Sequence, residues 1–189
     1  MSPPRRDNGD VALADDIVGA REGSVPAFER IYRDLAPAVA SYLRWNGVAD
    51  VESLTNMVLA QVHRNLHHFT GDAAAFRSWV FTIAHHRMVD DRRASGRRPT
   101  IADAEIHEAN LVGNAEDEAL DVLGSGRLRE LLDGLSPDQR DVLLLRIVAD
   151  LSLEDVAIAL GKRRGAIKSL QHRALATLRC QLDRERAES

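Results

Sequence analysis

Apolar residues recur along most of this chain at intervals of three and four, which is the spacing of an amphipathic α-helix. Near the C-terminus, for example, the positions i, i+3, i+4 and i+7 are taken by Leu153, Val156, Ala157 and Leu160. No segment shows a convincing period of two, so the pattern predicts no strand. We therefore expect an all-α fold.

The C-terminal part of the chain predicts one helix followed by a helix-turn-helix. Ser136 and Pro137 suit an N-cap and a first helical position, and Ser152 precedes Asp155 at near capping-box spacing. Gly161 is expected to end the second helix. The residues expected to face inward are Val142, Leu143, Leu145, Ile147 and Val148 in the first helix and Ile167, Leu170, Ala174 and Leu178 in the third.

The N-terminal part predicts four helices, over residues 11–22, 24–46, 50–66 and 76–93. Pro37 is expected to kink the second of them. Their apolar faces are expected to be Leu13, Ile17 and Val18; Phe28, Ile31, Tyr32 and Leu35; Val51, Leu54, Val58 and Val62; and Phe76, Trp79, Val80 and Ile83.

These elements divide into two all-α domains. Residues 1–10 are polar and contain prolines, so we expect them to be disordered. The first domain then covers residues 11–98 and the second residues 127–185. Residues 99–126 form a connector, expected to be flexible, with one short helix near 116–123.

The formal net charge is −4, which by itself argues against a nucleic-acid-binding protein. The distribution of charge changes that view. Residues 76–100 contain six arginines and two acids, residues 101–123 contain seven acids and no Lys or Arg, and residues 161–179 contain six basic residues and no acid. The connector is thus acidic and lies between two basic regions.

The basic charge of residues 161–179 lies on the last helix of the helix-turn-helix. Lys168, Ser169 and His172 fall opposite its apolar positions, with Gly165 beside them and Arg173 at the edge. A short helix, a glycine turn and a basic second helix are what reading of the DNA major groove requires. The plainer alternative is a solvated basic face.

This segment, LSLEDVAIALGKRRGAIKSLQHRALATLR, resembles the C-terminal promoter-binding region of extracytoplasmic-function (ECF) sigma factors. These are small alternative sigma subunits of bacterial RNA polymerase, within the sigma-70 superfamily. Arg163 and Ala166 depart from the family's usual Ser and Thr. The resemblance implies that the −35 promoter element is contacted by Arg164, Gly165, Lys168, Ser169, His172 and Arg173.

The N-terminal half extends the resemblance, through AFERIYRDLAPAVASYL, FTGD and FRSWVFTIAHHRMVDDRR. These segments look like the polymerase- and −10-binding region of the same family. The resemblance therefore implies a sigma region 2 bundle, a flexible acidic linker and a sigma region 4 helix-turn-helix. The linker is either a solvated tether or, as in the family, a segment that threads the RNA-exit path of the polymerase.

Promoter opening needs a pocket for an unstacked base and flat side chains for single-stranded bases. His86 stands where the family has Asn. The alternative is that Phe69 plugs a helix junction and His86 is solvated, and Trp79 is expected to be a core residue. The −10 contacts implied by the resemblance are Phe69, Thr70, Gly71, His86, Arg87, Arg92 and Arg93.

The third candidate site is the start of the helix at residues 50–66. In the family this face meets the β′ clamp coiled coil, and the β flap is a further polymerase contact. Ser53, Asn56 and Met57 depart from the family's acidic pattern, and a solvated helix face is the alternative. The implied polymerase-binding residues are Asp50, Glu52, Ser53 and Asn56.

Several other classes of function are disfavoured. Cys180 is the only cysteine, so an intrachain disulfide and a four-cysteine metal site are excluded. His63 and His67 lack a third ligand with clear spacing, so no metal or cofactor is expected. No secretory signal, membrane span, Ser-His-Asp set or phosphate-binding glycine loop is found. We expect a cytoplasmic protein that is not an enzyme.

The expected function is to direct RNA polymerase to a class of promoters and to help melt them. The partners are core polymerase and promoter DNA, and an anti-sigma protein as in many relatives. Two alternatives are a helix-turn-helix regulator that works without polymerase and a histidine-based metal enzyme.

Overall fold

The structure is a computed structural model that describes residues 7–96 and 126–188, and those ranges contain helices and no strand. The expected connector, with its short helix near 116–123, lies outside the described residues apart from residue 126. At the N-terminus the first helix already begins at Asp7, so residues 7–10 are helical rather than disordered as expected.

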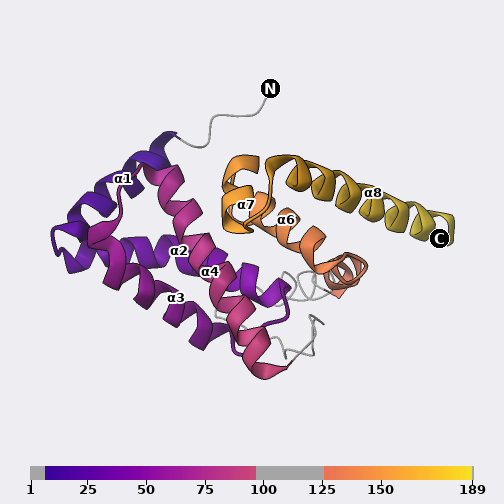
Figure 1. Cartoon of the computed structure of the whole chain (residues 1–189), viewed down its shortest axis with the longest axis horizontal. Helices are drawn as coiled ribbons and strands as arrows, with labels where there is room; N and C mark the ends of the chain where they lie inside the picture. The colour runs from indigo at the N-terminus through magenta and orange to yellow at the C-terminus, as the bar shows by residue number, and fades with distance from the viewer. Residues whose placement is uncertain (1–6, 97–125, 189) are drawn as a thin grey trace, which may run out of the picture.

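The first half consists of α1 (Asp7–Arg21), α2 (Val25–Trp45), α3 (Val51–Asn65), the short 3₁₀ helix η1 (Leu66–His68) and α4 (Ala73–Ser95). The four longer helices pack around one another (Figure 1). Three of them begin at side-chain caps: Ser24, Asp50 and Asp72 each accept a hydrogen bond from a backbone N–H three residues on.

The core of this half is largely the one the apolar pattern predicts. Ile31, Val58, Phe76 and Val80 are fully buried. The expectation for Val18 and Tyr32 was wrong, because these side chains are 54% and 40% exposed at the margins of their helices' apolar faces. Helix α2 runs through Pro37 without a break.

The second half begins with a helical segment at residues 126–133, followed by α6 (Pro137–Ile147), α7 (Leu153–Ala159) and α8 (Arg164–Glu188). Both predicted caps are confirmed, and Ser136–Gln139 and Ser152–Asp155 are full capping boxes. Leu144 is buried, whereas Ile147, expected inward, is the last residue of α6 and is 72% exposed.

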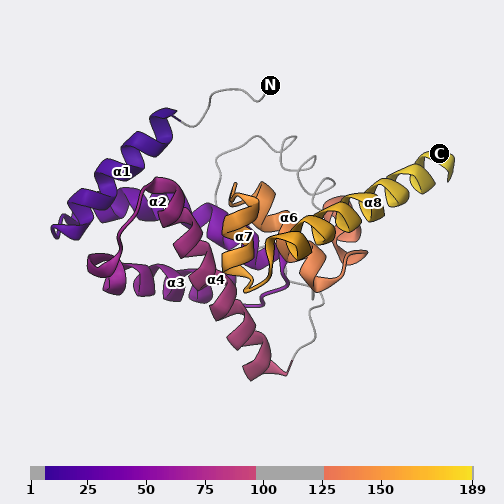
Figure 2. The same ribbon diagram turned by 45° about the horizontal axis from the view of Figure 1, so that its top comes forward.

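The two halves lie against each other. Helix α4 packs on α7, α2 also approaches α6, and their buried apolar residues form one continuous cluster (Figure 2). Arg140 and Asp141 of α6 are buried as well, at 3% and 4% exposure. The sequence pattern predicted two cores and gave no sign of this contact.

Candidate functional site

The polar face of α8 is presented to solvent, as predicted. Ile167 and Ala174 are fully buried on its inner side. Ser169 donates its hydroxyl hydrogen to the Gly165 carbonyl at 3.0 Å, so its oxygen offers only lone pairs outward. The six residues predicted to contact the −35 element are all exposed: Arg164, Gly165, Lys168, Ser169, His172 and Arg173.

Ion pairs fix how α8 leaves the turn of the helix-turn-helix. Gly161 has a φ of +61°, a left-handed conformation that glycine adopts without strain. Arg164 pairs with Glu154 of α7 at 2.6 Å, and Lys162 pairs with Asp138 of α6 at 2.9 Å. The start of the basic helix is therefore tied to both preceding helices.

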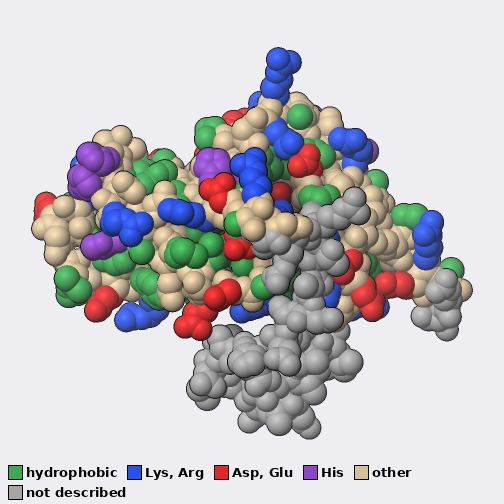
Figure 3. Space-filling model, turned by 60° about the horizontal axis from the view of Figure 1, so that its bottom comes forward, with side chains coloured by type: hydrophobic (Ala, Val, Ile, Leu, Met, Phe, Trp, Pro, Cys, Tyr) green, Lys and Arg blue, Asp and Glu red, His purple; other side chains and the backbone are tan. Residues whose placement is uncertain are grey.

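The predicted −10 residues divide into two groups. Thr70 and Gly71 are exposed in the loop between η1 and α4, and His86 and Arg93 are exposed on α4. The last two are seven residues apart, about two helical turns, so they share one face of α4. Figure 3 shows one face of the molecule, on which Lys and Arg side chains are interspersed with acidic ones rather than gathered in one basic band.

Phe69 does not present its ring to solvent, contrary to the expectation that it supplies a stacking surface. It is 8% exposed and stacks on Trp79, with ring centroids 5.3 Å apart, while Phe76 meets it edge-on at 5.1 Å. Gly71 has a φ of +150°, and a Cβ there would lie 3.0 Å from the Phe69 ring and 2.9 Å from the Ala75 Cβ. The loop conformation thus requires glycine where Phe69 turns inward.

Two of the predicted −10 arginines are engaged within the first half instead of being directed outward. Arg87 donates to Gln61 of α3 at 2.7 Å. Arg92 donates to the Asn46 carbonyl at 2.7 Å, which joins the end of α4 to the end of α2. Both side chains are half-buried.

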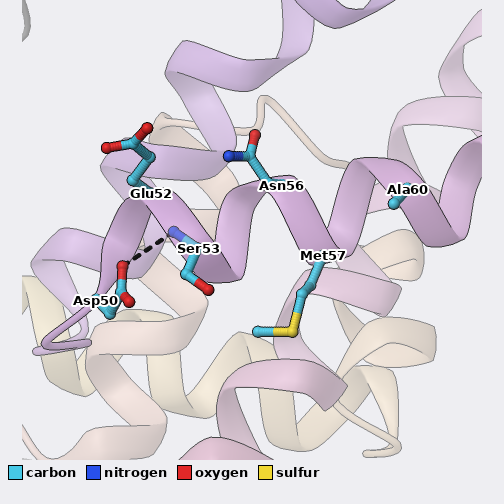
Figure 4. A pocket seen from close by; sticks show the side chains of 6 residues that line it. All are labelled: Asp50, Glu52, Ser53, Asn56, Met57 and Ala60. Carbon is cyan, nitrogen blue, oxygen red and sulfur yellow. Dashed lines mark hydrogen bonds between the residues drawn. The ribbon is translucent and has the colours of Figure 1, made fainter.

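The predicted polymerase-binding residues come together in one surface pocket on α3, where Asp50, Glu52, Ser53 and Asn56 are joined by Met57 and Ala60 (Figure 4). Asp50 caps the helix by accepting from the Ser53 N–H at 3.0 Å, and Tyr32 donates to Asn56 at 2.7 Å. The spacing of apolar residues assigned Tyr32 to the core. The sequence therefore did not predict that Tyr32 lies beside this surface.

Family comparisons match both halves. The family described as Sigma-70 region 2 matches residues 28–98, and Sigma-70, region 4 matches residues 125–178. The ECF RNA polymerase sigma factor BldN of Streptomyces coelicolor is 32% identical over 178 residues, which cover 93% of this chain and 67% of BldN. The chain belongs to the ECF family of RNA polymerase sigma factors.

Further relatives agree with this assignment. SigD of Mycobacterium tuberculosis, also an ECF sigma factor, is 29% identical over 178 residues, covering 90% of this chain and 82% of SigD. The solved structure of CnrH in complex with the cytosolic domain of CnrY covers 91% of this chain and 97% of its own, with 24% identity and a TM-score of 0.67, so the fold is shared.

The chain is therefore an alternative sigma factor, which acts in transcription initiation by binding core RNA polymerase and promoter DNA. The family assignment favours this function over the polymerase-independent regulator and the metal enzyme. Helices α2–α4 belong to region 2 and α6–α8 to region 4.

Within the described ranges of the sigma factor, no three His, Cys, Asp or Glu residues are placed to hold a metal ion. His63 instead packs edge-on against Phe28, with ring centroids 4.5 Å apart. The same ranges contain no helix with the length and apolar character needed to cross a membrane.

One polar cluster of the sigma factor was missed by sequence reasoning. Tyr42, His85 and Asp141 come from α2, α4 and α6 and meet where the two halves touch. Burial raises the pKa of Asp141 to about 6 and lowers the pKa of His85 to about 4. Because the residues are 43 and 99 positions apart, no local motif marks them.

Proposed function

We propose that the domains divide the work of promoter recognition, with residues 11–98 binding core polymerase and the −10 element and residues 127–185 binding the −35 element. The observation that carries the proposal is the exposed polar face of α8, which lies opposite a buried apolar seam in a helix-turn-helix. Residues 99–126 would be the linker between the two DNA contacts.

On the −35 element, α8 enters the major groove with Lys168 and His172 toward the base edges. Gly165 lacks a side chain and permits close approach of the helix to the DNA backbone. Arg164 and Arg173 lie at the margin of the face, where their guanidinium groups suit phosphates. Ser169 can accept a hydrogen bond from a base amino group, because its own hydrogen stays within the helix.

On the −10 element, His86 reads an extruded base and Arg93 contacts the backbone near it. Thr70 and Gly71 line the same site from the loop before α4. Phe69 supports that loop from inside, which its stacking on Trp79 favours over direct base contact. Arg87 and Arg92 act by fixing α4 to α3 and α2.

Asp50, Glu52, Ser53 and Asn56 form the contact with the β′ clamp coiled coil, and the second domain meets the β flap. The open pocket that these four residues line is suited to a partner side chain (Figure 4). An anti-sigma protein is a further partner in the proposal, competing for the same polymerase-binding surface. The chain acts by binding rather than by catalysis, in the cytoplasm, where polymerase and promoter are.

The assignment of α8 is tested by Lys168→Ala in holoenzyme. We expect promoter affinity to fall by about 1–3 kcal/mol, with altered preference at one −35 position, because a base contact is lost. Transcription is measured from promoters varied at each −35 base pair. Arg179→Ala is the matched control, since Arg179 is exposed three turns further along α8 and should leave base preference unchanged. Wild-type behaviour of Lys168→Ala on every promoter would show that α8 does not read the −35 bases through this residue.

A further inference from the structure

Asn56 stands between two adjoining hollows on the surface of the first domain. One is the pocket on α3 described above, and the other lies between α2 and α3, where Phe28, Tyr32 and His63 contribute to its lining. Asn56 and Ala60 line both hollows, so the two are continuous at this point. An exposed side chain at position 56 can therefore turn toward either hollow.

A hydrogen bond from α2 selects one of these orientations. Tyr32 donates its hydroxyl hydrogen to Asn56 Oδ1 at 2.7 Å, and Tyr32 is 40% exposed, so the bond lies at the surface. With Oδ1 held toward α2, the two hydrogens on Nδ2 are directed away from Tyr32 and can be donated to a partner. Figure 4 shows this nitrogen on the side of Asn56 that faces Glu52.

The amide of Asn56 adds hydrogen-bond donors to a surface that is otherwise rich in acceptors and apolar groups. Asp50 already caps the helix, and an ionised Glu52 can only accept. Met57, which is 45% exposed, and Ala60 are apolar. Besides the Ser53 hydroxyl, the side-chain donors of this pocket are therefore those of the Asn56 amide.

We propose that Tyr32 is a positioning residue for polymerase binding, whose hydroxyl holds the Asn56 amide so that Nδ2 faces the core enzyme. The inference rests on the proposed contact between α3 and the polymerase. It adds to that contact a residue of the neighbouring helix α2, which acts through Asn56.

Positioning should strengthen binding more than it stabilises the fold. A free asparagine side chain loses rotational freedom when it binds, and fixing it beforehand removes that cost from association. The expected gain is about three- to tenfold in affinity. Both side chains reach water, so each exchanges this bond for one with water when it is lost, and the stability of the free chain should change little.

The proposal is tested by a double-mutant cycle on the affinity for core polymerase. Full-length chains carry a dye on Cys180, the sole thiol and exposed, and are titrated with core RNA polymerase while fluorescence anisotropy is followed. Tyr32→Phe keeps the ring and removes the hydroxyl, and should weaken binding about three- to tenfold. In the Asn56→Ala background the same change should have no effect, because no amide is left to position.

Asp16→Asn is the matched control. It removes the ion pair of Asp16 on α1 with Arg30 on α2, an N–O distance of 2.6 Å, which lies in the same domain and does not involve α3. Its affinity for core polymerase should equal that of wild type. Circular dichroism at the temperature of the titration verifies that every variant is folded.

The cycle separates positioning from other roles of Tyr32. An equal loss in both backgrounds would show that Tyr32 contacts the polymerase itself or acts only on the fold, and wild-type affinity of Tyr32→Phe would show that the bond is not needed. Either result overturns the positioning role while the contact of Asn56 stands. Wild-type affinity of Asn56→Ala would instead contradict the polymerase contact proposed for Asn56, and the positioning role with it.

Discussion

At the scale of single residues, the region around α4 contains side chains that hold the fold and side chains that are exposed to solvent. Phe69, Arg87 and Arg92 contact other parts of the first domain, whereas His86 and Arg93 are exposed. The resemblance to the sigma family implied that the whole group contacts DNA. The structure separates the group by burial and by hydrogen-bond partners: some members stabilise the first domain, and the others are exposed.

Because Phe69 is buried and His86 is exposed, Phe69→Ala and His86→Ala should have different consequences. Phe69→Ala should lower the free energy of unfolding by about 3–5 kcal/mol, because a buried aromatic ring is lost. His86→Ala should leave stability nearly unchanged and abolish unstacking of one −10 base. Thermal unfolding of the free chain and a fluorescent base analogue at each −10 position in holoenzyme measure the two effects. Normal unstacking of every −10 base with His86→Ala would show that His86 is a solvated side chain that does not contact a base.

At the scale of helices, the periodicity of apolar residues was sufficient to predict the elements, the two capped turns and most of each core. It did not predict that α4 packs on α7 or that α2 approaches α6. Contacts between residues as distant as Tyr42 and Asp141 depend on how finished helices pack, and a buried Asp gives no periodic signal. The same limit applies to Phe69, whose ring direction depends on the backbone of Gly71.

The contact of α2, α4 and α6 predicts two opposing dependences on pH. The pKa of Asp141 is raised from 3.8 to about 6, so its contribution to stability is full below 3.8 and is lost as the pH rises through 6. The pKa of His85 is lowered from 6.5 to about 4, so its contribution is full above 6.5 and is lost as the pH falls through 4. The charged groups that act on these two are Arg92, Arg140, Asp138, His86 and Lys162.

Variants at His85 and Asp141 should each remove one of these two pH dependences of stability. Relative to wild type, His85→Gln should become more stable as the pH falls from 7 to 5, and Asp141→Asn should become less stable over the same range. The differences should be on the order of 1–3 kcal/mol. Urea unfolding at several pH values measures them. Parallel curves for all three proteins would show that the two groups do not titrate in the contact.

At the scale of the whole molecule, the proposed DNA-binding surfaces of the sigma factor lie on two halves of the chain that contact each other. The net charge is −4, and the basic residues are interspersed with acidic ones (Figure 3). Both features oppose tight binding of duplex DNA by the chain alone. We therefore expect specific promoter binding to require core polymerase.

The most direct test of this account is a footprint on one promoter, with the chain alone and with the chain plus core polymerase at the same salt concentration. We expect no specific protection from the chain alone and protection of both the −35 and −10 elements once core is added. Strong, specific protection by the chain alone would contradict the account and favour a regulator that works without polymerase.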